Sequence, residues 1–162
     1  IEILESLRNL EVSKTNIQLL LPLTYPKDDL VYITKIKDCL NSLNFNFKTY
    51  ETFMSDENVA RLRINTDIFI QLQKTDVLSG AMLEHIAAGS IVITGDWLPY
   101  DDLYNMGIEL IRVSKRSDVG NKLQEVIRNI DHHKLIARKN AEIVRNNFTW
   151  DHLVPTIIKI YD

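Results

Sequence analysis

The chain has 162 residues, of which 45% are hydrophobic and 25% are charged, a composition typical of one globular domain with a sizeable core. A formal net charge of −3 argues against general attraction to nucleic acid, and no apolar run reaches the roughly 20 residues that cross a bilayer. Cys39 is the only cysteine, so no intrachain disulfide forms and a reducing, cytoplasmic location is expected.

Helical and extended hydrophobic patterns alternate along the chain. In chain order, we expect a helix over 1–10, a strand over 17–21, a helix over 28–43, a strand over 45–49, a helix from 55, a strand over 67–72, a helix over 79–88, a strand over 91–94, a short helix through 103, a strand over 108–113, and helices over 119–146 and 150–161. Most of the strands are near-continuous apolar runs, which is typical of a parallel sheet covered on both faces. The pattern predicts an α/β fold, a Rossmann-like three-layer sandwich.

Several single residues refine these boundaries. The helix from 55 is expected to present Val59, Leu62 and Ile64 on its inner face. Gly89 is expected to end its helix in the left-handed conformation. The long C-terminal helical pattern is expected to break near Asp131, and Pro155 is expected to kink or shorten the last helix.

The segment 76–93 is the most informative part of the chain for function. Asp76 and Glu84 lie eight positions apart around a small-residue turn that opens a helix, and an apolar strand follows. A helix start offers unpaired backbone N–H groups and the positive end of a dipole, so it stabilises an anion such as phosphate. Because the turn follows a strand directly, we expect it at the edge of the sheet where ligands bind.

Several stretches of this sequence carry a resemblance to a known family. They are Thr66-Asp67-Ile68-Phe69-Ile70, the acid at Asp76, Leu83-Glu84, Ala87-Ala88-Gly89, Val92-Ile93 and the aromatic segment Asn147-Phe148-Thr149-Trp150. Together they resemble the C-terminal, nucleotide-sugar-binding half of retaining glycosyltransferases of the GT-B type, which have two Rossmann-like domains. The resemblance implies that residues 1–162 are one domain of a longer chain, and the start at Ile1 rather than at methionine agrees with this expectation.

The resemblance also implies the reaction and its partners. Such a domain binds a nucleoside diphosphate sugar and transfers the sugar, with retention and without a metal or other cofactor, to an acceptor that is a sugar, a lipid or a protein. The N-terminal Rossmann domain is expected to precede Ile1. Any peripheral attachment of the protein to the inner membrane is expected to occur through that domain. No nucleic-acid partner is expected, and the fragment alone is expected to be inactive.

Individual site residues follow from matching this sequence to the family's motif. The catalytic carboxylate is then Asp76, which faces the hydroxyls of the transferred sugar, and Glu84 accepts hydrogen bonds from the ribose diol. Two carboxylate oxygens suit two adjacent hydroxyl donors. The remaining donor-binding residues are the backbone of Leu78, Ser79, Gly80 and Ala81 for the diphosphate, Lys74 for its charge, and Phe53 and Met54 for the base.

The motif also departs from the family, which leaves other functions open. The first acid is Asp76 instead of glutamate, and Val77-Leu78-Ser79-Gly80 replaces a glycine-aromatic-glycine turn. A catalytically inactive glycosyltransferase-like scaffold is compatible with both changes. A flavodoxin-like module of the response-receiver kind shares the alternating layout, but the clustered acids and late-strand lysine that it needs are not evident.

Some nearby residues have competing structural interpretations. Trp97, Pro99 and Tyr100 either line an acceptor cleft or anchor a short helix. Phe53 and Met54 follow a predicted strand, where residues of these types usually belong to the core, so the core interpretation competes with the base-lining role. His85 is expected to pack or cap. The following adjacent pairs are expected to bind no metal: Asp28-Asp29, Asp101-Asp102 and His132-His133.

Overall fold

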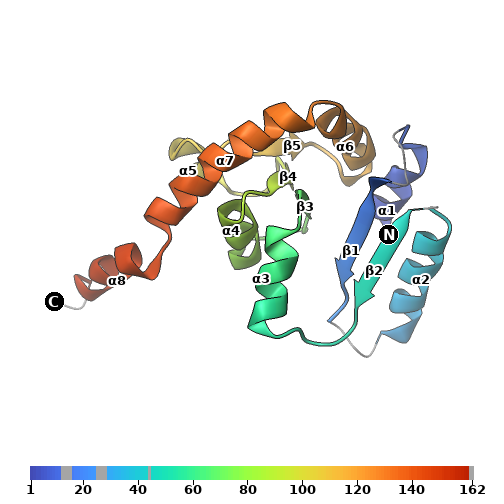
Figure 1. Ribbon diagram of the computed structural model, residues 1–162, viewed down its shortest axis with the longest axis horizontal. Helices are drawn as coiled ribbons and strands as arrows, with labels where there is room; N and C mark the ends of the chain where they lie inside the picture. The colour runs from blue at the N-terminus through green and yellow to red at the C-terminus, as the bar shows by residue number, and fades with distance from the viewer. Residues whose placement is uncertain (12–15, 25–28, 44, 161–162) are drawn as a thin grey trace. The chain divides into compact units, whose positions relative to one another are not determined.

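The computed structural model describes residues 1–11, 16–24, 29–43 and 45–160, and Figure 1 shows their helices and strands. The chain divides into two compact units, residues 1–60 with 115–128 and residues 61–114 with 129–162. Hydrogen bonds join the described strands into a two-stranded sheet, β1-β2, and a three-stranded sheet, β3-β4-β5, and every pairing is parallel.

The first unit contains the sheet β1-β2 and helices from both ends of its sequence. The Asp29 carboxylate caps α2 by accepting a 2.9 Å hydrogen bond from the Tyr32 backbone N–H. The backbone of Gly120 lies against Ser6, so α6 approaches α1 closely. The elements are α1 (Glu2–Ser6), a 3₁₀ turn (Leu7–Asn9), β1 (Gln18–Pro22), α2 (Leu30–Asn41), β2 (Asn46–Tyr50), a second 3₁₀ turn (Arg116–Asp118) and α6 (Val119–Arg128).

The helix α3 (Asp56–Ile64) connects the first unit to the second in sequence, and the second unit contains the three-stranded sheet. Its elements are β3 (Ile68–Gln71), α4 (Gly80–Ala87), β4 (Ile91–Gly95), α5 (Asp101–Asn105), β5 (Ile111–Val113), α7 (Ile130–Asn147) and α8 (Trp150–Ile158). The central strand β4 is buried along its whole length. Its Val92 packs in one apolar cluster with Met82 of α4, Leu103 of α5 and Val144 of α7.

The predicted α/β class with a Rossmann-like alternation of parallel strands and helices is confirmed. The order of elements agrees with the prediction, and most boundaries shift by only a few residues. Gly89 has a φ of 89° after α4, as predicted for a helix end. The long helical pattern breaks at Asn129, and α8 ends at Ile158 with Pro155 inside it.

One predicted core residue is wrong. Ile64 is 71% exposed, whereas Val59 and Leu62 are half-buried. Ile64 lies five positions after Val59, and an offset of five turns a side chain away from the stripe that spacings of three and four produce. The predictions for Asp28 and for Tyr161 concern positions outside the described residues. Across the described ranges, no helix has both the length and the apolar character needed to span a bilayer.

Candidate functional site at the carboxyl edge of the second sheet

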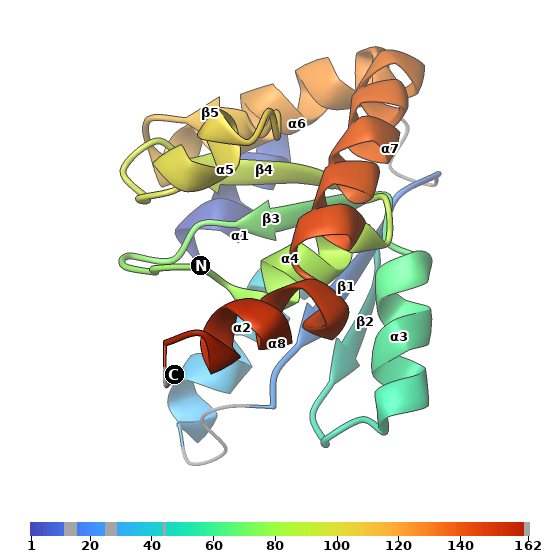
Figure 2. The ribbon, with the colours of Figure 1, turned by 90° about the vertical axis from the view of Figure 1, so that its left-hand side faces the viewer.

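The carboxyl ends of β3, β4 and β5 meet at one edge of the second sheet because the strands are parallel. The loop from β3 to α4 and the loop from β4 to α5 both leave from this edge, at the left in Figure 2. In open α/β sheets ligands bind beyond this edge. Asp76 lies on the first loop, and Trp97 and Tyr100 lie on the second.

The carboxylate of Asp76 is held by two donors. The Tyr100 hydroxyl donates a 2.7 Å hydrogen bond to Oδ2, and the Gln71 side-chain amide donates a 2.9 Å bond to the same oxygen. Within the described part of the chain, Oδ1 carries no hydrogen bond. Asp76 therefore has one anchored oxygen and one that is available to a further donor.

Both donors are rigidly placed. Gln71 is the last residue of β3 and is 4% exposed, while Tyr100 is 1% exposed and packs in the apolar cluster around β4. Burial, together with the hydrogen bond and the negative charge of Asp76, raises the pKa of the Tyr100 hydroxyl far above its usual range. Tyr100 thus stays a neutral donor to Asp76. The interpretation of Tyr100 as an anchor for the short helix fits its position as the N-cap of α5.

Trp97 makes a second connection between the two loops. Its indole N–H donates a 2.9 Å hydrogen bond to the Gln73 carbonyl. The indole lies against Gly95, where any Cβ would overlap its six-membered ring. With 36% of its surface exposed, Trp97 presents part of an aromatic ring at the same edge as Asp76.

The start of α4 is open to a ligand. The Ser79 hydroxyl caps the helix by accepting a 3.2 Å bond from the Met82 N–H, while Gly80 and Ala81 occupy the first exposed turn. A Cβ built at Gly80 would meet no atom of the described chain within 4 Å, which agrees with the exposure of Gly80 and Ala81. Leu78 is 43% exposed and Lys74 is exposed. The predicted diphosphate-binding segment is accessible.

Glu84 lies in the second turn of α4 and has a different partner from Asp76. Its side chain is 55% exposed and forms an ion pair with Arg63, whose side chain is 23% exposed. A carboxylate with one cationic partner keeps accepting capacity for hydroxyl donors. The structure therefore does not link the two predicted acids to each other; it connects Asp76 to the loop after β4 and Glu84 to the end of α3.

His85 is a packing residue, as expected. Its ring stacks on Phe69 with centroids 4.0 Å apart, and Nδ1 lies 3.3 Å from the Ser90 hydroxyl. Because Ser90 donates its proton to the Thr66 carbonyl, Nδ1 is the donor in the contact with Ser90. Burial, helped by the charge of Arg63, lowers the pKa of His85 to about 4.

Phe53 and Met54 belong to the first unit, whereas Asp76 and Glu84 belong to the second. Phe53 is 61% exposed and Met54 is half-buried. The core interpretation of Phe53 is therefore wrong, and its role with Met54 toward a nucleotide base stays a prediction.

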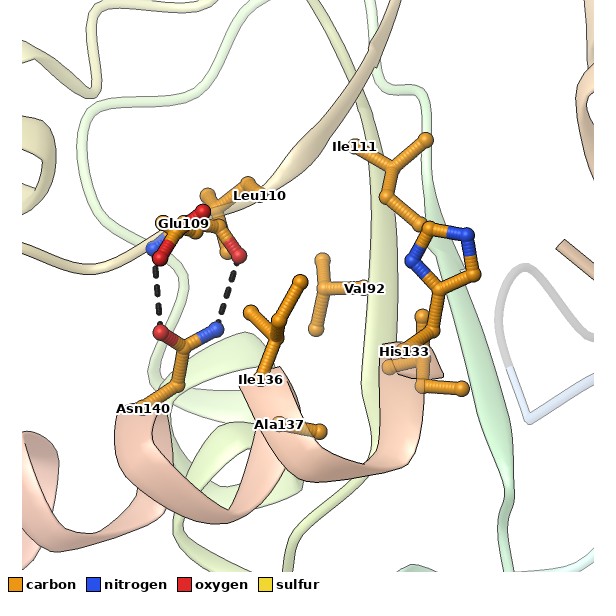
Figure 3. A pocket seen from close by; sticks show the side chains of 9 residues that line it. Val92, Glu109, Leu110, Ile111, His133, Ile136, Ala137 and Asn140 are labelled. Carbon is orange, nitrogen blue, oxygen red and sulfur yellow. Dashed lines mark hydrogen bonds between the residues drawn. The ribbon is translucent and has the colours of Figure 1, made fainter. Parts of the chain in front are cut away.

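A small pocket lies at the opposite edge of the second sheet. Figure 3 shows it beside α7 and the first residues of β4 and β5. Its volume is about 170 Å³. The Asn140 side chain closes one side by two hydrogen bonds to the Glu109 backbone, of 3.0 and 2.7 Å. This volume is below the roughly 300 Å³ at which small-molecule pockets begin, and none of the predicted site residues lines it. Among the described residues, no group of three His, Cys, Asp or Glu side chains is arranged to hold a metal ion.

The fold and this edge define a Rossmann-like α/β protein with its candidate site at the carboxyl ends of the strands. The profile of the glycosyl transferase-like family matches residues 25–159, which is most of the chain. The chain belongs to this family. A search of curated proteins found no match.

Sequence reasoning did not find Arg63 or Gln71. Gln71 had a weak signal, since a polar residue interrupts the apolar run Ile68-Phe69-Ile70 near its carboxyl end. Arg63 had none, because it is one of two arginines near the end of an ordinary polar helix.

Proposed function

We propose that this chain is the nucleotide-sugar-binding, C-terminal half of a retaining glycosyltransferase of the GT-B type. Membership of the glycosyl transferase-like family supports glycosyl transfer as the class of reaction. The specific support is Asp76, which presents one carboxylate oxygen at the carboxyl edge of the sheet, a few residues before the uncovered start of α4. We further propose a cytoplasmic location and an N-terminal partner domain on the same polypeptide.

In the proposed mechanism, the chain binds the donor and stabilises the leaving group. The backbone N–H groups of Gly80 and Ala81, which have no partner within α4, meet the diphosphate, and Lys74 adds a positive charge. Glu84 accepts hydrogen bonds from the ribose diol while Arg63 holds its other side. Asp76 accepts a hydrogen bond from the transferred sugar.

Calorimetric titration of nucleoside diphosphates and their sugars tests this proposal. Glu84→Ala is expected to weaken nucleotide binding about tenfold, which corresponds to roughly 1.4 kcal/mol. Glu84→Gln keeps the side-chain length and separates loss of charge from loss of packing. Glu142→Ala, an exposed glutamate on α7, is the matched control and is expected to bind as the wild type does.

The outcomes separate the functions. If no nucleotide binds at millimolar concentration, or if Glu84→Ala binds as tightly as the wild type, the donor site is not at α4. Binding by a full-length protein that transfers no sugar would instead support the inactive scaffold.

A further inference from the structure

We infer that Tyr100 and Gln71 are positioning residues that aim Oδ1 of Asp76 at a hydroxyl of the transferred sugar. This inference rests on the proposed function and adds to it how the chain recognises the sugar part of the donor. It assigns a binding role to the loop from β4 to α5, in addition to the motif around α4.

The geometry separates the two oxygens of Asp76 by role. Oδ2 receives both the Tyr100 hydroxyl at 2.7 Å and the Gln71 amide at 2.9 Å. These two donors come from different elements, the start of α5 and the end of β3, so they fix the direction of the carboxylate as well as its position. Hydrogen bonds to a charged group are stronger than neutral ones, which makes this anchor effective.

The hydrogen bonds from Tyr100 and Gln71 to Oδ2 also determine which kind of ligand group Oδ1 can bind. An ionised carboxylate is only an acceptor, so Oδ1 takes a donor such as a pyranose hydroxyl and disfavours a phosphate oxygen. The part-exposed Trp97 ring on the same loop adds an apolar surface beside it. Asp76 is therefore suited to bind the sugar of the donor, while the start of α4 is suited to bind the diphosphate.

Aspartate at this position explains why an anchor is needed. Its side chain is one methylene shorter than that of glutamate, so the loop itself must bring the carboxylate to the sugar. The bond from Tyr100 joins the Asp76 loop to the loop after β4, and the Trp97 bond to Gln73 joins the same two loops independently. Because this second connection remains when the Tyr100 hydroxyl is removed, we expect Tyr100→Phe to fold.

The test compares two hydroxyl deletions near the same short helix. Tyr100→Phe removes the donor to Asp76 and keeps the buried ring. Tyr104→Phe is the matched control, because the buried Tyr104 hydroxyl has no hydrogen-bond partner within the described residues. Gln71→Met, which removes the other donor at similar volume, is the second variant. Each is titrated with a panel of nucleoside diphosphate sugars and with the corresponding nucleoside diphosphates.

In the wild type, we expect the best sugar donor to bind more tightly than its bare nucleoside diphosphate. Tyr100→Phe and Gln71→Met are each expected to weaken binding of that donor about fivefold to tenfold, because Asp76 loses one of its two anchoring hydrogen bonds while its contact with the sugar remains possible. Binding of the bare nucleoside diphosphate is expected to change less than about twofold, and Tyr104→Phe is expected to change neither.

Three results would overturn the inference alone, and a fourth would overturn the proposed function as well. Undiminished binding of the sugar donor by both variants would show that the anchor is irrelevant. Equal weakening of donor and bare nucleotide would show a general structural role. A wild type that binds nucleotides but gains nothing from the sugar would remove the contact at Oδ1. Absence of all nucleotide binding would refute the proposed function itself, and the inference with it.

Discussion

At the scale of single residues, glycine at position 95 permits the Trp97 indole to lie against the end of β4. Any Cβ there would overlap the ring, so Gly95→Ala is expected to displace Trp97 and to break its bond to Gln73. We expect a loss of about 1–3 kcal/mol in the free energy of unfolding, the usual cost of overpacking. Thermal unfolding and tryptophan fluorescence measure the two effects.

Gly80→Ala is the control for this substitution, because a Cβ at Gly80 meets nothing within 4 Å and alanine favours a helix. It is expected to unfold at the wild-type temperature or above. Wild-type stability and fluorescence in Gly95→Ala would show that the indole does not lie against β4.

At the scale of elements, the close approach of α6 to α1 depends on a single glycine. A Cβ at Gly120 would overlap the backbone carbonyl of Ser6, and a backbone carbonyl cannot rotate away as a side chain does. Gly120→Ala is expected to destabilise the protein by about 3 kcal/mol, because the two helices must separate. The midpoint of urea unfolding measures this change.

Asn121→Ala, at the neighbouring exposed position of α6, controls for the effect of a substitution in this helix. It is expected to shift the midpoint little. If Gly120→Ala and Asn121→Ala have the same stability, the contact between α6 and α1 is looser than described.

Elements were largely predictable from the sequence because their signals are local. The break in the helical pattern, the glycine after α4 and the apolar strands each depend on residues a few positions apart. The prediction that Ile64 is buried was wrong because the short helix α3 has only a weak apolar stripe, and Ile64 in the last turn of α3 lies outside that stripe.

At the scale of the whole molecule, stability is expected to depend on pH through His85. Burial lowers its folded-state pKa from 6.5 to about 4, so between these values the unfolded chain binds more protons than the native one. The contribution of His85 to the free energy of unfolding is therefore constant above about pH 6.5 and falls as the pH drops toward 4. We expect His85 to account for a loss of about 1–3 kcal/mol.

Urea unfolding at several pH values between 7 and 4 measures this loss. His85→Phe keeps a ring that can stack on Phe69 and removes the titrating group, so it is expected to show a shallower decline. Asn121→Ala, which removes no titrating group, is the control and is expected to retain the wild-type slope. An unchanged slope in His85→Phe would mean that other groups cause the acid sensitivity.

Local patterns in the amino-acid sequence are enough to predict the α/β class, the order of the elements and the resemblance around Asp76 and Glu84. These depend on hydrophobic period, caps and short motifs, which are set by neighbouring residues. The partners of the two acids, in contrast, became known from the folded structure: Tyr100 lies 24 positions from Asp76, and Arg63 lies on another helix from Glu84. Such contacts form when packing of the apolar cores brings distant segments together, and no local pattern encodes which polar side chains then meet.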